Sequence, residues 1–362
     1  MTHDLIHVGA GDQGLRWLDS FIPANEETGH VNLVGVVDPD EDALSEAEAH
    51  ADLPADRFYA DLEEALSEHD ADAVSNVTPP PVHEDVVDAA IDHDVHVISE
   101  KPIAHTLESS VRIAEKVERA GLKMGITMSH RFRQDVTSLR RRIRSGAHGD
   151  VDYLVGRYAV NARSYGWVDR LYDWDEHPML IDGSVHHLDL LADLAGGTCE
   201  TVFAHSWNPA WSEFDGDPNA VVTMVLDNGT RVTYEGSNTN AVSLNGWGNE
   251  HVRAECENAT LILDGHEIRR FEYDPEGENC LENNRFEDGE RVQLEDGEKW
   301  SNAWLIEQFA EWLDGGPEME TNVRDNLQSM AMVYGAIESA ETGESVRVQD
   351  LLEETRERVD VT

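Results

Sequence analysis

Lysine is scarce in this chain of 362 residues: of its 27 basic residues only four are lysine, whereas 74 residues are Asp or Glu and the formal net charge is −47. Two like charges about 10 Å apart in water repel by only about 0.4 kcal/mol. Dozens of such pairs would nevertheless erode a stability of about 5–15 kcal/mol. Molar salt shortens the screening length to about 3 Å. We therefore expect marginal stability in dilute buffer and recovery in molar KCl.

Cysteine and long apolar runs are also scarce. The three cysteines, Cys199, Cys256 and Cys280, are widely spaced and odd in number, which argues against a disulfide framework or a zinc ribbon. No apolar stretch approaches the roughly 18 residues needed to span a bilayer. The N-terminal residues lead directly into a strand and a glycine turn, without a signal segment. We expect a cytoplasmic protein without a membrane partner, and its composition resembles that of cytosolic proteins of extreme halophiles.

The chain has no long run of Lys and Arg. The densest basic cluster is "LRRRIR" at 139–144, which we interpret as the solvated face of a helix. A nucleic-acid partner requires a basic surface, which this sequence does not supply. We therefore expect no nucleic-acid partner.

The first 128 residues alternate short apolar runs with amphipathic helical patterns. This alternation predicts repeated strand–helix–strand units and a parallel sheet covered on both faces, that is, a doubly wound α/β domain. The predicted strands are 5–8, 31–37, 72–77, 95–99 and 123–128, and the predicted helices include 42–51, 83–92 and 107–121.

Residues 129–362 have a different pattern and predict a second α+β domain with a mostly antiparallel sheet. Strands are expected at 151–160, 220–226, 230–236 and 259–271, and a helix at 179–196. Two helices, near 302–314 and 323–341, close the chain and can pack back on the first domain. The acidic, glycine-containing stretch 274–299 is expected to be an exposed excursion.

A glycine-rich turn directly follows the first predicted strand and opens a helix. This pattern is typical of dinucleotide binding, because the glycines allow a tight turn, close approach of a pyrophosphate and close helix–strand packing. Asp38 ends the second strand, where a carboxylate can accept hydrogen bonds from the ribose hydroxyls of the adenosine and repel a 2′-phosphate. The sequence favours NAD as cofactor, with NADP as the alternative. The predicted cofactor residues of the turn are Gly9, Gly11, Asp12, Gln13 and Gly14.

Two further segments follow predicted strands and belong to the same edge of a parallel sheet, where ligands of such sheets bind. In "NVTPPPVHEDVV" we expect Thr78 and Pro79 beside the cofactor, and His83 either as a cofactor contact or on the helix surface. In "SEKPIAHT" Glu100 and Lys101 follow the fifth strand. Because the chain uses so little lysine, we do not interpret Lys101 as an ordinary surface lysine. The proline after it favours an extended backbone at Lys101.

The helix with "IDGSVHHLD" contains the third group of candidates. Asp182 and His186 are four residues apart and Asp189 is three further on, so all three lie on one face. His187 points away from that face, so the two adjacent histidines do not form a metal-binding pair. We expect no metal site.

In combination these motifs resemble the Gfo/Idh/MocA oxidoreductases, typified by glucose–fructose oxidoreductase and myo-inositol dehydrogenase. The resemblance covers nearly the whole chain, and the Glu-Lys-Pro tripeptide is its most specific element; "SHRFRQD" and "NVRDNLQSMAMVYGAIESAETGESVRV" extend it. It implies that Lys101 contacts both the nicotinamide ribose and a substrate hydroxyl, that His186 accepts the proton, and that Asp182 positions lysine or substrate. One departure is His177-Pro178, where many members have glycines.

The resemblance also implies an N-terminal Rossmann domain, an open sheet in the C-terminal domain, a substrate and an assembly. A sugar, polyol or inositol is the expected substrate, and a homodimer or homotetramer formed through the C-terminal sheet is the expected assembly. A glycosidase that uses NAD transiently and a non-catalytic sugar-sensing regulator are the alternatives. The residues that correspond to the family's substrate pocket are His130, Arg131, Asn161, Arg163, Tyr165 and Trp167.

Overall fold

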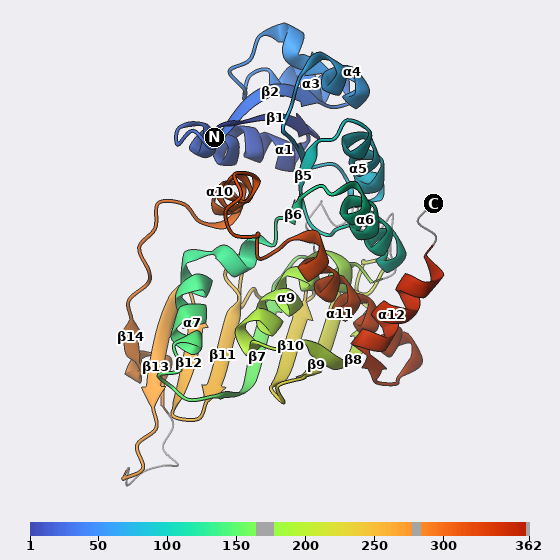
Figure 1. Ribbon diagram of the computed structural model, residues 1–362. Coiled ribbons are helices and arrows are strands. Elements are labelled where there is room, and N and C mark those ends of the chain that lie inside the picture. The colour runs from blue at the N-terminus through green and yellow to red at the C-terminus, as the bar shows by residue number, and fades with distance from the viewer. Residues whose placement is uncertain (164–176, 277–283, 360–362) are drawn as a thin grey trace. The chain divides into compact units, whose positions relative to one another are not determined.

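The computed structural model describes residues 1–163, 177–276 and 284–359 (Figure 1). The chain forms two compact units, each built from separate segments. The first unit contains residues 1–129, 298–330 and the residues from 355 onward, and the second contains residues 130–297 and 331–354.

The first unit contains a six-stranded sheet with the order β3-β2-β1-β4-β5-β6. All of its strand pairs are parallel, which confirms the predicted doubly wound sheet. β3 has only two residues, too few to be recognised from an apolar run. The strands are β1 (His3–Val8), β2 (Val31–Val37), β3 (Phe58–Tyr59), β4 (Ala73–Asn76), β5 (His96–Ser99) and β6 (Met124–Ile126).

The helices of the first unit begin and end at residues suited to those positions. In α6 (Leu107–Ala120), Thr106 forms a capping box with Ser109 at the start, and Gly121 adopts the left-handed conformation at the end. The other helices of this unit are α1 (Asp12–Arg16), α2 (Ile22–Glu26), α3 (Glu41–Ala47), α4 (Leu62–Glu68), α5 (His83–Asp92) and α10 (Ser301–Leu313).

A π-helical turn, η1 (Trp17–Phe21), joins α1 to α2. Pro23 lies in the first turn of α2, where it lacks an N–H and would crowd the carbonyl group four residues earlier in a regular helix. The wider π turn just before it gives the ring space, so the helix continues without a break.

Residues 298–330 belong to the first unit by direct hydrogen bonds. The hydroxyl of Thr321 donates to the carbonyl of Ile126 at 2.7 Å, and the amide of Ile126 donates to the carbonyl of Thr321 at 2.8 Å. The side chain of Asn25, in α2, donates to the carbonyl of Ala303 in α10 at 2.9 Å. Residues 298–330, which are far away in the sequence, therefore complete the packing of the first unit.

The second unit contains a nine-stranded sheet with the order β14-β13-β12-β11-β7-β10-β9-β8-β15. β7 and β10 pair in parallel and every other pair is antiparallel, as predicted for this sheet. The strands are β7 (Val151–Ala159), β8 (Cys199–Trp207), β9 (Asn219–Leu226), β10 (Arg231–Ser237), β11 (His251–Cys256), β12 (Ala259–Asp264), β13 (Glu267–Glu272), β14 (Glu290–Val292) and β15 (Val346–Arg347).

Helices α7 (Gln134–Arg144) and α9 (Ser184–Ala195) lie on one face of this sheet (Figure 1). Gly156 in β7 allows α9 to approach closely, because a Cβ atom there would lie 2.6 Å from a methyl carbon of Leu191. β9 and β10 alternate buried and less buried residues, so their second face is open. The chain also forms α11 (Val323–Thr342) and α12 (Val348–Arg358).

Three details differ from the sequence predictions. The single strand expected at 259–271 is the β12–β13 hairpin, because Gly265 and His266 both have positive φ values, +56° and +61°, as in a type I′ turn. The acidic stretch 274–299 includes β14, which pairs with β13. Arg140, in the basic cluster at 139–144, is buried, since its guanidinium packs over Phe132 and contacts Asp193.

Among the helices in the described ranges, none combines the length and apolar character that a membrane crossing requires.

Candidate active site

The glycine-rich turn has the form that a dinucleotide requires. Gly9 has a φ of +99°, and a Cβ atom there would lie 2.7 Å from the carbonyl group of Val77. A Cβ atom at Gly14 would lie 1.9 Å from the carbonyl oxygen of Gly9, so the chain's own backbone excludes side chains at both positions. At Gly11 a Cβ atom would meet nothing within 4 Å. The turn is thus tightly packed at Gly9 and Gly14 and open at Gly11, where a pyrophosphate can approach the backbone.

Asp38 is held at the end of β2 beside this turn. Its Oδ2 accepts a hydrogen bond from the amide of Ala10 at 2.7 Å, and its Oδ1 accepts one from the amide of Asp40 at 2.9 Å. Each carboxylate oxygen keeps a second lone pair. The residues present therefore fit an adenosine ribose as well as the pyrophosphate of NAD.

The segment after β4 is fixed from inside the first unit. The hydroxyl of Thr78 donates to the side-chain oxygen of Asn76 at 2.7 Å, whereas Pro79 is exposed. The ring of His83 is fully buried, with Nε2 2.8 Å from the carbonyl oxygen of Thr78 and Nδ1 3.1 Å from that of Ile103. Burial lowers the pKa of His83. His83 therefore does not lie on the helix surface; it links the segments that follow β4 and β5.

Glu100 anchors the segment that contains Lys101. Its Oε1 accepts hydrogen bonds from Gln13 at 2.9 Å, from the indole of Trp17 at 2.9 Å and from the amide of Asn302 at 3.1 Å. Its Oε2 accepts one from the backbone amide of Lys101 at 3.3 Å. The carboxyl end of β5 is therefore tied to the helix that begins in the glycine turn.

Trp17 and Asn302 were not predicted as parts of this site. Trp17 is four residues after Gln13 and so lies on the same helix face, a signal that the spacing contained. Asn302 is 202 residues from Glu100, and no local pattern connects them. Asp12, the remaining predicted residue of the turn, is exposed in the first turn of α1.

In the second unit, Asp182 and His186 come from a π turn and the helix that follows it. Asp182 lies in η5 (Met179–Gly183), and His186 and Asp189 lie in α9. The ring of His186 is buried and stacks on the ring of His130, with centroids 4.1 Å apart and an interplanar angle of 7°. Asp189 accepts two hydrogen bonds from the guanidinium of Arg131. The structure thus brings two predicted substrate residues, His130 and Arg131, to the helix that contains His186.

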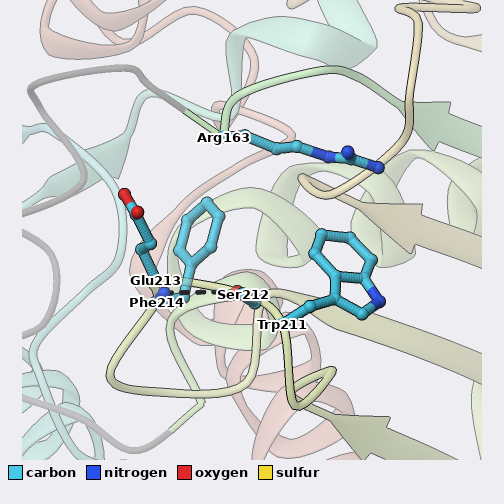
Figure 2. A pocket seen from close by; sticks show the side chains of 5 residues that line it. All are labelled: Arg163, Trp211, Ser212, Glu213 and Phe214. Atoms are coloured by element: carbon cyan, nitrogen blue, oxygen red, sulfur yellow. Dashed lines mark hydrogen bonds between the residues drawn. The ribbon is translucent and has the colours of Figure 1, made fainter.

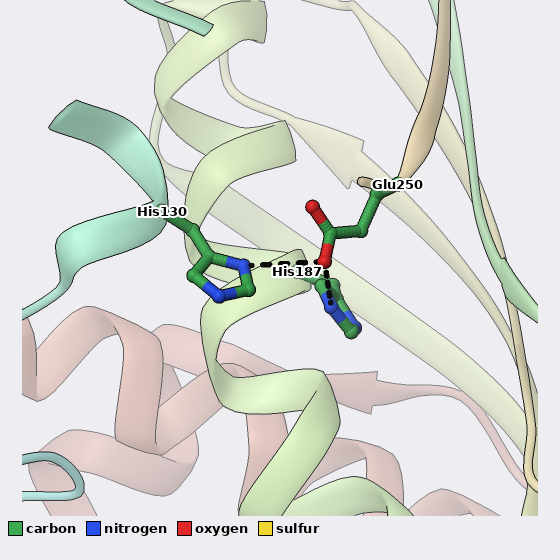
Figure 3. Close-up of side chains that lie close together, drawn as sticks. All are labelled: His130, His187 and Glu250. Atoms are coloured by element: carbon green, nitrogen blue, oxygen red, sulfur yellow. Dashed lines mark hydrogen bonds and ion pairs between the residues drawn. The ribbon is translucent and has the colours of Figure 1, made fainter. Parts of the chain in front are cut away.

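His187 faces a different set of groups, of which Figure 3 shows His130 and Glu250. Its Nδ1 lies 2.6 Å from the hydroxyl of Tyr234, and its Nε2 lies 3.3 Å from Oε1 of Glu250. Nδ1 of His130 lies 3.5 Å from the same oxygen. The nearby His130, His187 and Arg133 hold the pKa of Glu250 well below its usual range, against the effect of burial. Glu250 was not predicted, because it is 63 residues from His187.

Asn161 and Arg163 follow β7 and are held by a neighbouring segment. The side chain of Asn161 donates to the carbonyl of Ala241 at 3.2 Å, and the guanidinium of Arg163 donates to that of Thr239 at 2.9 and 2.6 Å. Arg163 also stacks over Trp211, with 4.3 Å from its central carbon to the ring centroid. Tyr165 and Trp167 lie outside the described residues.

A pocket of about 220 Å³ lies at Arg163 (Figure 2). The other residues that line it are Trp211, Ser212, Glu213 and Phe214. A guanidinium, an indole and a carboxylate together suit a ligand with both hydroxyl groups and an apolar face.

Two family models match the chain. Residues 7–128 match the model described as the oxidoreductase family with an NAD-binding Rossmann fold, and residues 136–261 match the Gfo/Idh/MocA C-terminal domain. The chain belongs to the Gfo/Idh/MocA oxidoreductase family. The expectation of an NAD-dependent oxidoreductase is thereby confirmed.

The chain is also similar to other proteins and to solved structures. The uncharacterized protein y4oX of Sinorhizobium fredii is 46% identical over 356 residues, which cover 98% of each chain. Inositol 2-dehydrogenase of Corynebacterium glutamicum is 27% identical over 234 residues, 63% of this chain and 65% of that protein. The structure of aldose–aldose oxidoreductase from Caulobacter crescentus has a TM-score of 0.81 at 17% identity and covers 96% of this chain and all of that one; it shows the shared fold.

Proposed function

We propose that the protein oxidises a hydroxyl group of a sugar, polyol or inositol by transferring a hydride to NAD, with Lys101 and His186 handling the proton. The names of its relatives, among them inositol 2-dehydrogenase and scyllo-inositol 2-dehydrogenase (NAD⁺), support this class of substrate. Bound NAD supplies the hydride acceptor.

The observation that carries the proposal is the anchoring of Glu100 to the glycine turn. Because Glu100 accepts hydrogen bonds from Gln13 and Trp17, the next residue, Lys101, is held at the cofactor edge of the sheet. An ammonium group there stabilises the negative charge that develops on the substrate oxygen as hydride leaves its carbon. Lysine suits this role because it is a compact point charge, whereas arginine is a wide, planar fork.

His186 is the proposed acceptor of the hydroxyl proton. An imidazole has a reference pKa of about 6.5 and can take a proton near neutrality. General-base assistance of this kind contributes about 10²–10⁴-fold to the rate. The ring of His186 is fixed by its stacking on His130, and we assign Asp182 the role of positioning lysine or substrate.

For the cofactor, we propose that the turn shaped by Gly9 and Gly14 receives the pyrophosphate at Gly11 and that Asp38 binds the adenosine ribose. The carboxylate of Asp38 is already fixed by two backbone amides and would repel a 2′-phosphate. NAD is therefore the preferred cofactor and NADP the weaker one.

A comparison of two lysine variants tests the proposed mechanism. Lys101→Met should lower turnover by about 10³-fold or more, because a preorganised charge at the reacting oxygen is lost. Lys116→Met is the matched control: Lys116 lies in the same unit but pairs with Glu84 and Asp88 on the surface of α5, so turnover should stay near that of the wild type. Activity is measured at 340 nm in molar KCl with a panel of sugars, polyols, inositols and glycosides and with both NAD and NADP.

The same panel separates the alternatives. NAD binding should survive in Lys101→Met, measured by quenching of tryptophan fluorescence, so that loss of turnover reports chemistry alone. Undiminished turnover in this variant would rule out the mechanism. Release of free sugar from a glycoside without net NADH would identify a glycosidase, and ligand binding without either product would identify a sugar sensor.

We also propose that the open face of the nine-stranded sheet forms a homodimer or homotetramer. Val225 in β9 is among the large apolar residues that remain exposed. Val225→Asp should shift the oligomer toward the monomer in light-scattering measurements; a monomeric wild type would contradict this assembly.

A further inference from the structure

The cluster formed by His130, His187 and Glu250 has the spacing of a metal-ion site (Figure 3). Each residue offers one ligand atom, and all three atoms lie within 4.8 Å of one another. All three residues are buried. We propose that this cluster binds one divalent transition-metal ion, such as Zn²⁺ or Co²⁺, through Nδ1 of His130, Nε2 of His187 and Oε1 of Glu250.

The distances fit a metal better than they fit hydrogen bonds. Metal–nitrogen and metal–oxygen bonds of about 2.0–2.2 Å in tetrahedral geometry place neighbouring ligand atoms about 3.3–3.5 Å apart. Oε1 of Glu250 lies 3.3 Å from Nε2 of His187 and 3.5 Å from Nδ1 of His130. A hydrogen bond between an imidazolium and a carboxylate would instead be about 2.7–2.9 Å long.

The contacts around His187 fix the orientation of its ring. The hydroxyl of Ser184 donates to the carbonyl of Met179 at 2.9 Å and lies 3.3 Å from the hydroxyl of Tyr234. The hydroxyl of Tyr234 lies 2.6 Å from Nδ1 of His187. When the proton of a neutral imidazole is on Nδ1, Nε2 has the lone pair and directs it toward the carboxylate, and a cation between the two groups stabilises that arrangement.

These contacts also form the outer shell that metal ligands usually have. Tyr234 orients His187 from the far side of its ring. Glu250 is oriented by the amide of Gly248, which donates to Oε1 at 2.8 Å, and by Arg133, which pairs with Oε2. Each carboxylate oxygen has two lone pairs, so Oε1 retains one for an ion.

The net charge of the groups around the cluster favours a bound cation. Arg133 is shared between two carboxylates, Glu250 and Asp135, so these three groups have a net negative charge. His266, which also contacts Asp135, is exposed. Two imidazole nitrogens and one carboxylate oxygen are donors that favour ions such as Zn²⁺ over Mg²⁺ or Ca²⁺.

The sequence predicts no metal site because His186 and His187, two neighbours, face different directions. His187 meets His130 and Glu250 instead, across 57 and 63 positions of the sequence. His130 also stacks on His186, so a bound ion would fix the ring that supports the proposed proton acceptor.

The test measures metal binding and does not depend on enzymatic activity. Untagged full-length protein is stripped with EDTA in molar KCl and titrated with Co²⁺, followed by visible absorption and by metal analysis after equilibrium dialysis. We expect one tight equivalent with the bands of a four-coordinate ion, displaced by Zn²⁺. His187→Gln and Glu250→Gln should weaken binding by about 100-fold or more, since each removes a ligand. Tyr234→Phe, which keeps all ligands, should weaken it by about 10-fold.

His205→Gln is the matched control. His205 is exposed in β8, and its loss should leave the tight equivalent unchanged. The acidic surface will bind further ions weakly, and that background should be equal in all variants. Absence of a tight equivalent, or equal affinity in wild type and His187→Gln, would overturn the proposal. If His187→Gln fails to fold, Tyr234→Phe decides, and wild-type affinity in that variant overturns it as well. Failure to find dehydrogenase activity would not affect this result.

Discussion

Two buried glutamates organise the two units in different ways. Glu100, 9% exposed, accepts hydrogen bonds from Gln13, Trp17 and Asn302, which are all neutral. Glu250, 4% exposed, faces a guanidinium and two imidazoles. The first carboxylate is bound by neutral hydrogen-bond donors, whereas two of the three partners of the second are imidazoles, whose charge can change. We therefore expect the Glu100 contacts to act as fixed scaffolding and the Glu250 contacts to respond to protons and metal ions.

Salt is expected to have the largest effect, and it should affect both units because it acts on the surface. With a formal net charge of −47, repulsion is long-ranged in dilute buffer and largely screened at molar ionic strength. The melting temperature should rise strongly between dilute buffer and molar KCl. Sucrose at the same osmolality serves as the control, since it does not screen charge. A melting temperature that does not change with the KCl concentration would contradict the expectation.

Glu250→Gln should be the most destabilising of the substitutions compared here. It leaves the guanidinium of Arg133 with one carboxylate instead of two, and breaking a buried ion pair costs about 3–5 kcal/mol. We expect about 3 kcal/mol in denaturant titrations in molar KCl, because Asp135 remains. Glu295→Gln removes a more exposed pair with Arg141 and should cost no more than about 1 kcal/mol. Equal costs would mean that the burial of Glu250 has no energetic consequence.

His7, in β1 beneath the glycine turn, should make the first unit sensitive to acid. Its ring is buried, with Nδ1 2.8 Å from the hydroxyl of Ser75, and burial lowers its pKa to about 4. The unfolded chain takes up this proton near pH 6.5, so the contribution of His7 is complete above that pH and is lost as pH falls toward 4. The free energy of unfolding should fall by about 2 kcal/mol between pH 7 and pH 5 through this group alone. His7→Gln should reduce the pH dependence of the free energy of unfolding by that amount. An unchanged pH dependence would show that His7 is protonated in the folded state.

Glu100→Gln should have the smallest effect and sharpens the contrast with Glu250. A glutamine can keep one oxygen for the neutral donors but presents its amide to the backbone N–H of Lys101, so we expect a loss of about 1–2 kcal/mol. That loss should be the same with and without added Zn²⁺. For Glu250→Gln the loss in the free energy of unfolding should be larger when Zn²⁺ is present, because only the wild type would then be stabilised by binding the ion. Glu27→Gln, an exposed position in the same unit, is the control.

The sequence was sufficient for features that depend on neighbours along the chain. An apolar run predicted β2 and an amphipathic pattern predicted the helix of His83, both at their observed bounds. The glycine turn was predicted from the steric needs of Gly9 and Gly14. The hairpin at Gly265 was missed because its turn has only two residues, and the strand-like residues on both sides of it were interpreted as one strand. Asn302 and Glu250 were missed for another reason: each meets its partners only after distant segments are brought together. His83 was expected near the surface or the cofactor, and only the packed structure shows its two backbone partners.

The segment 298–330 has a consequence for how the protein is made. Asn302 and Thr321 supply contacts to Glu100 and Ile126, yet a ribosome adds them 202 and 195 residues after those partners. The N-terminal portion of the nascent chain therefore stays incomplete until residues 298–330 have been synthesised. A gene truncated after the last strand of that sheet should yield a poorly soluble fragment, and supplying residues 298–330 as a separate peptide should rescue it.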